Sequence, residues 1–333
     1  MQKAPIAVLG AGSWGTTLAL VLARNGHRVR LWGHDPGHVQ ALVAARENRR
    51  HLPGAAFPDT LLPTAELAVA MEGVGDCVVV VPSHAFEAQV AALAPLLPAN
   101  GRVLWATKGL DAASGGLLHG LVERHLPGRA MAVLSGPSFA GEVAEGLPTA
   151  VTIASRDRHF ATDMAEAFHG GGFRPYTSND LVGVELGGAV KNVLAVATGI
   201  ADGLGLGANT RAGLITRGLA ELLRLGVALG ADRQTFMGLS GVGDMILSCT
   251  DDQSRNRRFG LALGGGSSID RALAEIGQTV EGLRTASEVH TLAGRLRVEM
   301  PICEQVYQVV VNQRPPQTAL RALMARTRKS EFY

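Results

Sequence analysis

The sequence predicts an α/β domain built on a parallel sheet, followed by an all-helical domain. Up to about residue 178, short apolar runs that suit buried strands alternate with helical stretches. From Asp180 onward these strand-like runs almost vanish, and long helical stretches replace them. A chain of 333 residues is long enough for two domains, so we expect one domain over 1–179 and a second over 180–333.

The first elements form a β-α-β unit. Residues Ile6 to Leu9 are a short apolar run of the kind found in buried parallel strands. Thr16 to Arg24 has helical spacing, and Gly26 is placed to end that helix. Arg28 to Trp32 then predicts a second strand.

The later elements repeat this alternation and then abandon it. Further strands are expected at 77–82, 102–109, 130–137 and 149–155, with a helix over 87–97. Strands that alternate with helices favour a parallel sheet covered on both faces. In the second half, helices are expected at 180–201, 210–229, 282–297 and 301–312, with a short final helix after Arg314-Pro315-Pro316.

Composition narrows the class of protein. Hydrophobic residues make up 47 % and charged residues 18 %, so the chain can bury sizeable cores. A net charge of +2 argues against a nucleic-acid binder. The three cysteines are far apart and the ten histidines lack ligand spacing, so we expect no disulfide framework and no metal site. With no leader peptide and no apolar run near ~20 residues, we expect a cytoplasmic protein without a membrane span.

A glycine motif, Gly10-Ala11-Gly12-Ser13-Trp14-Gly15, follows the first strand directly and opens the first helix. In this pattern the first glycine permits a tight turn and the second lets the backbone approach a pyrophosphate. The third lets helix and strand pack closely, while the helix N-terminus faces the anion. We therefore expect a Rossmann-type domain that binds a dinucleotide.

The choice between NADP(H) and NAD(H) stays open. An acidic residue about twenty positions after the motif would bind the ribose 2′-hydroxyl and favour NAD(H). Asp35 stands there, but only after Gly33 and His34 have followed the strand. His34 would instead favour a 2′-phosphate, although more weakly than an arginine would.

Two loops at strand ends are candidate anion sites. Lys108 follows the strand of 102–109, at the edge of the sheet where ligands bind. Ser135 and Ser138 follow the next strand, and a helix expected to begin at Ser138 would offer backbone N–H groups. Taken alone, each loop fits an ordinary turn as well as it fits an anion-binding site.

The helical half carries a basic cluster and a single acid. Arg255, Arg257 and Arg258 fall within "SRNRRFG", where Ser254 and Asn256 add neutral donors. Such a run is typical of a solvated face, but an arginine fork also suits a phosphate. Asp244, between apolar neighbours, fits a helix cap or turn, or a carboxylate that orients a lysine or a substrate hydroxyl.

Lys191 is the one charged residue between Leu186 and Ile200. A lone lysine in an apolar helix ordinarily lays its stem along the surface and lifts its ammonium group into water. The alternative is a proton donor beside a substrate oxygen, with Gly187 and Gly188 leaving room for the ligand. Reduction uses the charged form, whereas oxidation needs a neutral amine, whose ordinary pKa is about 10.4. The lysine would therefore suit reduction at neutral pH.

The motifs resemble those of bacterial NAD(P)-dependent glycerol-3-phosphate dehydrogenase in order along nearly the whole chain. They are "GAGSWGTTLA", "ATKGL", "SGPSFA", the long segment that begins "VELGGAVKNVLAVATG", "TFMGLSGVGDMILSC" and "SRNRRFG". The resemblance implies interconversion of sn-glycerol 3-phosphate and dihydroxyacetone phosphate for phospholipid synthesis. It also implies a cytoplasmic enzyme that forms a homodimer.

The resemblance also assigns residues to roles. It makes Lys191 the catalytic lysine. It implies substrate contacts at Lys108, Gly136, Ser138, Lys191, Asp244, Ser254, Arg255 and Asn256. Together with the glycine motif it implies cofactor contacts at Gly10, Gly12, Ser13, Trp14, Gly15, His34, Lys108, Ala140, Arg255, Thr279 and Glu281. Two positions depart from the family pattern: His34 stands where many members have arginine, and Thr279 where valine is usual.

Two other functions are compatible with the residues alone. The first is a dehydrogenase of another small hydroxy acid or sugar phosphate. The second is a redox sensor that binds a dinucleotide without catalysis and dimerises through its helical domain.

Overall fold

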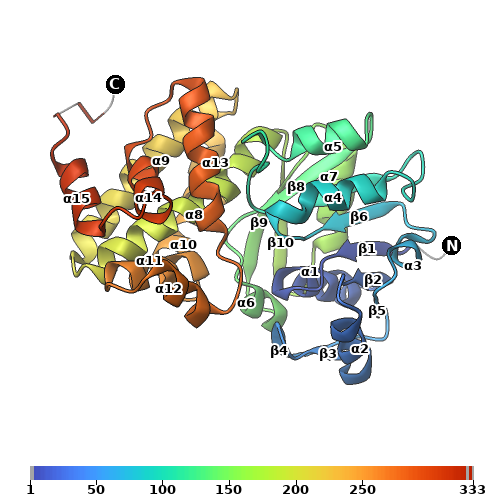
Figure 1. Ribbon diagram of the computed structural model, residues 1–333. Coiled ribbons are helices and arrows are strands. Elements are labelled where there is room, and N and C mark those ends of the chain that lie inside the picture. Colours follow the sequence, from blue (N-terminus) through green and yellow to red (C-terminus); the bar gives the residue numbers. More distant parts are fainter. Residues whose placement is uncertain (1–3, 328–329, 332–333) are drawn as a thin grey trace. The chain divides into compact units, whose positions relative to one another are not determined.

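The computed structural model describes residues 4–327 and 330–331 (Figure 1). Its contacts divide the chain into two compact units. The first holds the described residues up to Gly188 together with Gln234–Asp244, and the second holds Ala189–Arg233 and the described residues from Met245 onward. The domain boundary expected near residue 179 stays a prediction, because helix α8, Leu181–Gly203, belongs to both units.

The first unit is built on an eight-stranded sheet with the order β10-β9-β8-β7-β6-β1-β2-β5. The order reverses between β1 and β6, as it does in dinucleotide-binding sheets. The strands are β1 Ile6–Leu9, β2 Val29–Trp32, β5 Leu61–Thr64, β6 Asp76–Val79, β7 Arg102–Trp105, β8 Met131–Ser135, β9 Thr149–Ala154 and β10 Phe173–Ser178. A separate antiparallel pair joins β3, Glu47–Asn48, to β4, Leu52–Ala56.

Every pairing in the large sheet is parallel except that of β8 with β9, which is antiparallel. The predicted parallel sheet is therefore confirmed, with β8 and β9 as its one antiparallel pair. The short segment between the two strands holds α6, and the chain returns through it in the opposite direction.

Helices cover both faces of the sheet and bury two separate cores. One core joins α1 and α7 to β1, β2 and β9, with Leu18, Leu22 and Phe160 fully buried. The other joins α4, α5 and the start of α8 to the opposite face, around Phe86 and Trp105. The helices are α1 Ser13–Arg24, α2 Pro36–Ala45, α3 Leu67–Met71, α4 Ser83–Leu93, α5 His119–His125, α6 Ala140–Glu145 and α7 Arg158–Phe168.

The described chain after Ser178 contains helices and no strands, so the expected change to helical structure is confirmed. After α8 come α9 Gly207–Ala228, the 3₁₀ turn η1 Arg233–Met237, the π-helical turn η2 Leu239–Gly243, α10 Asp244–Thr250, α11 Arg255–Gly264, α12 Ile269–Ile276, α13 Glu281–Leu296, α14 Pro301–Val310 and α15 Pro316–Met324. In the second unit α8 and α11 pack closely, because Gly199 and Gly260 each lie against a backbone carbonyl of the other helix.

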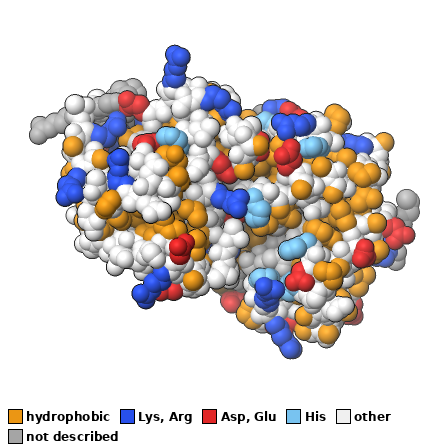
Figure 2. All heavy atoms as spheres, in the orientation of Figure 1, with side chains coloured by type: hydrophobic (Ala, Val, Ile, Leu, Met, Phe, Trp, Pro, Cys, Tyr) orange, Lys and Arg blue, Asp and Glu red, His pale blue; other side chains and the backbone are white. Residues whose placement is uncertain are grey.

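Among the described helices, α8 alone is long and apolar enough to cross a membrane. However, 94 % of its most apolar 18-residue window is buried within the protein, as in the core helix of a folded domain. On the face shown in Figure 2, acidic and basic side chains are interspersed, in keeping with the net charge of +2.

Candidate active site

The glycine loop between β1 and α1 leaves room for a pyrophosphate. Gly10 has a φ of 126°, and a Cβ there would collide with the carbonyl of Val80, just after β6. A Cβ on Gly15 would collide with the carbonyl of Gly10. At Gly12, by contrast, a Cβ would meet no atom within 4 Å. Gly12 is also the N-cap of α1 without a side-chain cap, so the helix N-terminus is open to an anion, and the loop fits a dinucleotide.

A buried asparagine that the sequence did not single out holds this loop. The Nδ2 group of Asn48 donates to the carbonyl of Ala11 at 3.0 Å and to Oγ1 of Thr16 at 2.7 Å. Asn48 is fully buried, so losing these bonds would leave polar groups without partners in the core. Its position in β3, far along the chain from the loop, gives no sequence signal for this role.

The acid considered as a ribose partner, Asp35, caps α2. Its Oδ1 atom accepts the backbone N–H groups of Gly37 at 3.0 Å and His38 at 3.2 Å. Both hydrogen bonds lower the pKa of Asp35 below its ordinary value, and the bond from His38 has the larger effect. Its Oδ2 atom lies 3.8 Å from Arg50, and the neighbouring His34 is exposed after β2.

At the carboxyl ends of β7 and β8, four of the predicted residues come together. The Nζ atom of Lys108 lies 2.6 Å from Oδ2 of the fully buried Asp244 and 3.2 Å from the carbonyl of Gly136. The hydroxyl of Ser138 donates to that same carbonyl at 3.0 Å. All four residues belong to the first unit. Asp244 thus orients a lysine, one of the two roles considered from the sequence.

The segment after Gly136 differs slightly from expectation. Helix α6 begins at Ala140, not at Ser138, with Phe139 as its N-cap. Ala140 is fixed because its carbonyl accepts the hydroxyl of Thr17 from α1 at 3.0 Å. Trp14 and Ala140 both pack against the first core.

Gly187 and Gly188 make close packing possible. A Cβ on Gly187 would collide with the carbonyl of Ser240 in η2. A Cβ on Gly188 would come 2.6 Å from Oγ of Ser135 and 3.6 Å from Cγ of Lys108. Both glycines were expected from the sequence to leave room for a ligand. The backbone carbonyl of Ser240 already requires glycine at Gly187, whereas Gly188 meets only the side chains of Ser135 and Lys108.

In the second unit, Lys191 is 8 % exposed, and its Nζ atom donates to Oγ of Ser248 at 2.7 Å. The ammonium group is therefore held inside the protein and does not reach out into water. Ser248 lies on α10 and is not among the site residues predicted from the sequence. The signal available was its spacing of four residues from Asp244, which puts both on one face of a helix.

Asn192, next to Lys191, connects to the predicted substrate residues of α11. The Nδ2 group of Asn256 donates to Oδ1 of Asn192 at 2.9 Å, and Oδ1 of Asn256 accepts the N–H of Gly282 at 2.9 Å. Asn256 is thereby fixed between α8 and the start of α13.

The three arginines of "SRNRRFG" differ sharply from one another. Arg257 is buried and pairs with Asp202 at 2.9 Å, while Arg258 is exposed. Arg255 donates to Gln278 at 3.2 Å. Burial lowers the pKa of Arg255, the negative charge of Glu281 partly offsets this, and Arg258 lowers it further. The cluster is thus one buried structural arginine, one solvated arginine and one half-buried arginine facing an acid.

The other predicted residues of this region lie around Arg255. Ser254 caps α11 and accepts the N–H of Arg257 at 3.3 Å. Glu281 is the first residue of α13, and Thr279 is exposed just before it. The described residues contain no group of histidine, cysteine or acidic side chains that could hold a metal ion.

Fold and glycine loop together define a Rossmann-type dinucleotide-binding protein with a helical second unit. Two family models match the chain: the N-terminal region of NAD-dependent glycerol-3-phosphate dehydrogenase over residues 5–161, and its C-terminal region over 180–321. The chain belongs to this family.

Individual relatives agree with this assignment. The chain is 60 % identical over 328 residues, 98 % of each chain, to glycerol-3-phosphate dehydrogenase [NAD(P)+] of Halorhodospira halophila. It is 58 % identical, over 97 % of each chain, to the enzyme of the same name from Alkalilimnicola ehrlichii. The crystal structure of the Coxiella burnetii glycerol-3-phosphate dehydrogenase, 50 % identical, aligns with a TM-score of 0.95 over 98 % of this chain and all of that one.

Proposed function

We propose that this protein is an NAD(P)H-dependent oxidoreductase that interconverts dihydroxyacetone phosphate and sn-glycerol 3-phosphate. Family membership over both regions of the chain supports the reaction class. The observation that carries the assignment of the chemistry is the buried contact between Lys191 and Ser248, at 2.7 Å. The contact keeps the ammonium group inside the protein, whereas a lone lysine in an apolar helix ordinarily lifts its ammonium group into water.

Lys191 would serve as the proton donor in the reducing direction. A bound nicotinamide cofactor supplies the hydride, and the ketone oxygen of the substrate then needs a proton. The hydroxyl of Ser248 positions the ammonium group, because the hydrogen bond restricts where Nζ lies. The water-poor surroundings strengthen its attraction for developing negative charge on that oxygen. In the oxidising direction the same residue, as a neutral amine, would accept the proton.

The remaining predicted residues divide into two roles. Arg255 would hold the substrate phosphate with its planar fork, helped by Ser254 and Asn256. Lys108, fixed by Asp244 and by the carbonyl of Gly136, would offer a second positive charge beside Ser138. The cofactor would lie along the glycine loop, with Ser13, Trp14, His34, Ala140, Thr279 and Glu281 as further contacts.

The proposal includes the cofactor preference, the metabolic role, the location and the oligomeric state. We expect both NADPH and NADH to support the reaction, with a modest preference for NADPH. Supply of glycerol 3-phosphate for phospholipid synthesis, a cytoplasmic location and a homodimeric state belong to the same proposal, carried by the family resemblance.

Turnover of dihydroxyacetone phosphate with NADPH and with NADH tests the proposal. Unphosphorylated dihydroxyacetone and a set of small 2-keto acids serve as matched alternatives. We expect NADPH and NADH to be oxidised only when the phosphorylated ketone, dihydroxyacetone phosphate, is present. Faster turnover of a keto acid would make the protein a dehydrogenase of another substrate. Dinucleotide binding without turnover of any substrate would indicate a sensor.

A further inference from the structure

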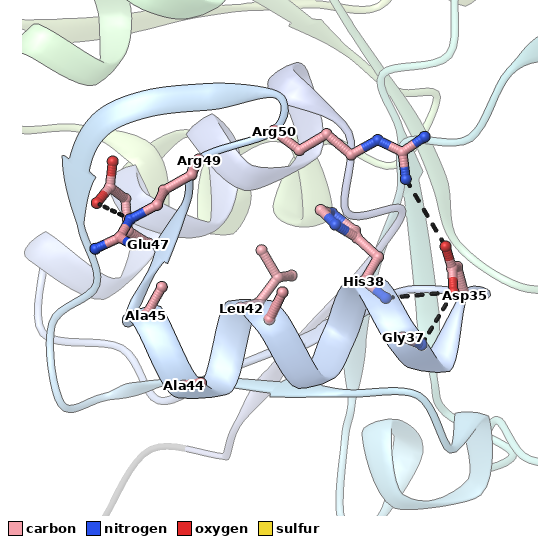
Figure 3. Close-up of a pocket in the computed structure, with 10 residues that line it drawn as sticks. Asp35, Gly37, His38, Leu42, Ala44, Ala45, Glu47, Arg49 and Arg50 are labelled. Carbon is pink, nitrogen blue, oxygen red and sulfur yellow. Dashed lines mark hydrogen bonds and ion pairs between the residues drawn. The ribbon is translucent and has the colours of Figure 1, made fainter.

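An open cavity of about 770 Å³ lies in the first unit between α2 and the segment that follows it (Figure 3). One wall is apolar and is formed by α2, through Ala41, Leu42, Ala44 and Ala45. The polar part carries Asp35 and His38 at the start of α2, and Glu47, Arg49 and Arg50. Of these residues only Asp35 has been considered above, as a partner of the cofactor ribose; the others have no assigned role in cofactor or substrate binding.

The cavity adjoins the glycine loop. His38, which lines it, has its Nε2 atom 3.4 Å from the carbonyl of Ala11, between Gly10 and Gly12. Asn48, next to the two arginines in sequence, donates to the same carbonyl. Asp35 follows β2, and in sheets of this strand order the adenosine ribose of a dinucleotide lies at that strand end. The cavity is therefore next to the position of the ribose 2′ substituent.

The two arginines are held differently. Arg49 lies 3.3 Å from Glu47, within hydrogen-bonding distance. Arg50 lies 3.8 Å from Oδ2 of Asp35, too far for a hydrogen bond, and its side chain is 67 % exposed. Figure 3 shows Arg50 extending from the loop toward Asp35 at the N-terminus of α2. Arg50 can thus turn toward a ligand at little cost, whereas Arg49 would first have to leave its partner.

Charge explains why Arg50 matters for the choice of cofactor. Asp35 is held as a carboxylate by two N–H groups, and its free side would repel a 2′-phosphate. A single positive charge beside it cancels this repulsion and adds a fork that matches phosphate geometry. His34, the residue expected from the sequence to face a 2′-phosphate, does not line the cavity.

We propose that Arg50 is the residue that recognises the 2′-phosphate of NADP(H), by neutralising Asp35 and binding the phosphate directly. The inference rests on the proposed function in so far as that function requires a dinucleotide at the glycine loop. It makes Arg50 a residue that sets cofactor specificity, with no part in the chemical step.

Calorimetric titration with two nucleotides that differ only in the 2′-phosphate tests this without turnover. Adenosine 2′,5′-bisphosphate and 5′-AMP are each titrated into the full-length protein and into Arg50→Ala, Arg49→Ala and His34→Ala. In Arg50→Ala, affinity for the bisphosphate should fall about tenfold, as for loss of a charged hydrogen bond, while affinity for 5′-AMP should stay within about twofold. Arg49→Ala, which removes the neighbouring arginine of the same cavity, should change neither affinity by more than about twofold.

The outcomes separate this inference from the proposed function. Equal losses of affinity for the bisphosphate in Arg49→Ala and Arg50→Ala would show a general effect of positive charge and would overturn the role of Arg50. A selective loss in His34→Ala alone would transfer that role to His34. Either result leaves the proposed dehydrogenase intact. If the wild-type protein binds neither nucleotide, the dinucleotide site and the inference both fail.

Discussion

The ammonium group of Lys108 lies 2.6 Å from a carboxylate oxygen of Asp244, and Asp244 has no exposed surface. Lys108 itself is partly exposed, with 18 % of its side chain accessible. The pair joins the end of β7 to the end of η2 within the first unit. A buried carboxylate beside a lysine that reaches the surface is an asymmetric ion pair, and the two partners should respond differently to removal.

Lys108→Met should destabilise the protein more than Asp244→Asn. Removing the lysine takes the ammonium group away from a fully buried carboxylate, which costs about 3 kcal/mol in comparable sites. Removing the acid leaves an ammonium group that water can reach, so the free energy of unfolding should fall by less. Urea-induced unfolding of both variants measures the difference. Equal losses of stability in the two variants, or a larger loss in Asp244→Asn, would contradict the expected difference between the partners of this ion pair.

Gly12→Ala and Gly10→Ala should separate cofactor binding from folding. Alanine at Gly12 meets no protein atom within 4 Å, so the melting temperature should hardly change while affinity for NADPH falls at least about tenfold. Alanine at Gly10 would be strained at a φ of 126° and would collide with Val80, so the fold itself should weaken. Thermal unfolding and nucleotide titration on both variants check this. A destabilised Gly12→Ala protein with normal affinity would refute the assignment of the loop.

Arg255→Ala should lower kcat/KM for the phosphorylated substrate by roughly ten- to a hundred-and-fifty-fold, because losing a charge-assisted fork costs about 1.5–3 kcal/mol. Arg255→Lys, which keeps the charge but not the fork, should recover only part of this. Arg258→Ala is the matched control, since Arg258 is exposed. Arg257 does not serve as a control, because its ion pair with Asp202 is buried and its loss should destabilise the protein. Equal, small kinetic effects in Arg255→Ala and Arg258→Ala would end the phosphate assignment.

Glu221 should make stability depend on pH. It lies buried on α9 and accepts the N–H groups of Ile302 at 2.7 Å and Cys303 at 3.1 Å. Burial raises its pKa from 4.5 to about 7. Because the folded protein holds this proton more tightly, the stabilisation is fully present below about pH 4.5 and is lost as the pH rises through about 7.

Melting temperatures of the wild type and of Glu221→Gln between about pH 5 and about pH 8 test this expectation. The amide carries no titrating proton, so the variant should lack the decline that Glu221 adds to the wild-type curve. Parallel curves for the two proteins would show that Glu221 does not titrate in this range.

Local patterns predict the first β-α-β unit and the helical second half well. Ile6 to Leu9 is an uninterrupted apolar run, and the glycine motif follows this strand directly and opens a helix, which is the context that a dinucleotide-binding motif requires. The apolar run of β9, in contrast, is the same whichever direction it takes beside β8, so its antiparallel pairing has no sequence signal. The strand pair β3–β4 does not stand out from a loop, because β3 is only two polar residues long and β4 contains Pro53 and Gly54, which are unusual inside strands.

The candidate site, too, can be predicted from the sequence only in part. The motifs that contain Lys108, Asp244 and Lys191 can each be found in the sequence, but their partners depend on contacts between distant segments. Arg257 shows this most clearly, because a run of arginines is typical of a solvated face until Asp202 is known to lie beside one of them. The role of Asn48 in holding the glycine loop is hidden for the same reason.

The most direct test of the account is the rate at which Lys191→Ala reduces dihydroxyacetone phosphate. Steady-state turnover at neutral pH, on a variant whose folding and NADPH affinity are measured in parallel, isolates the proton transfer. If Lys191 donates the proton, kcat should fall at least ~100-fold while the affinity for NADPH changes by less than about twofold. A folded Lys191→Ala protein that turns over at the wild-type rate would contradict the central role of this lysine.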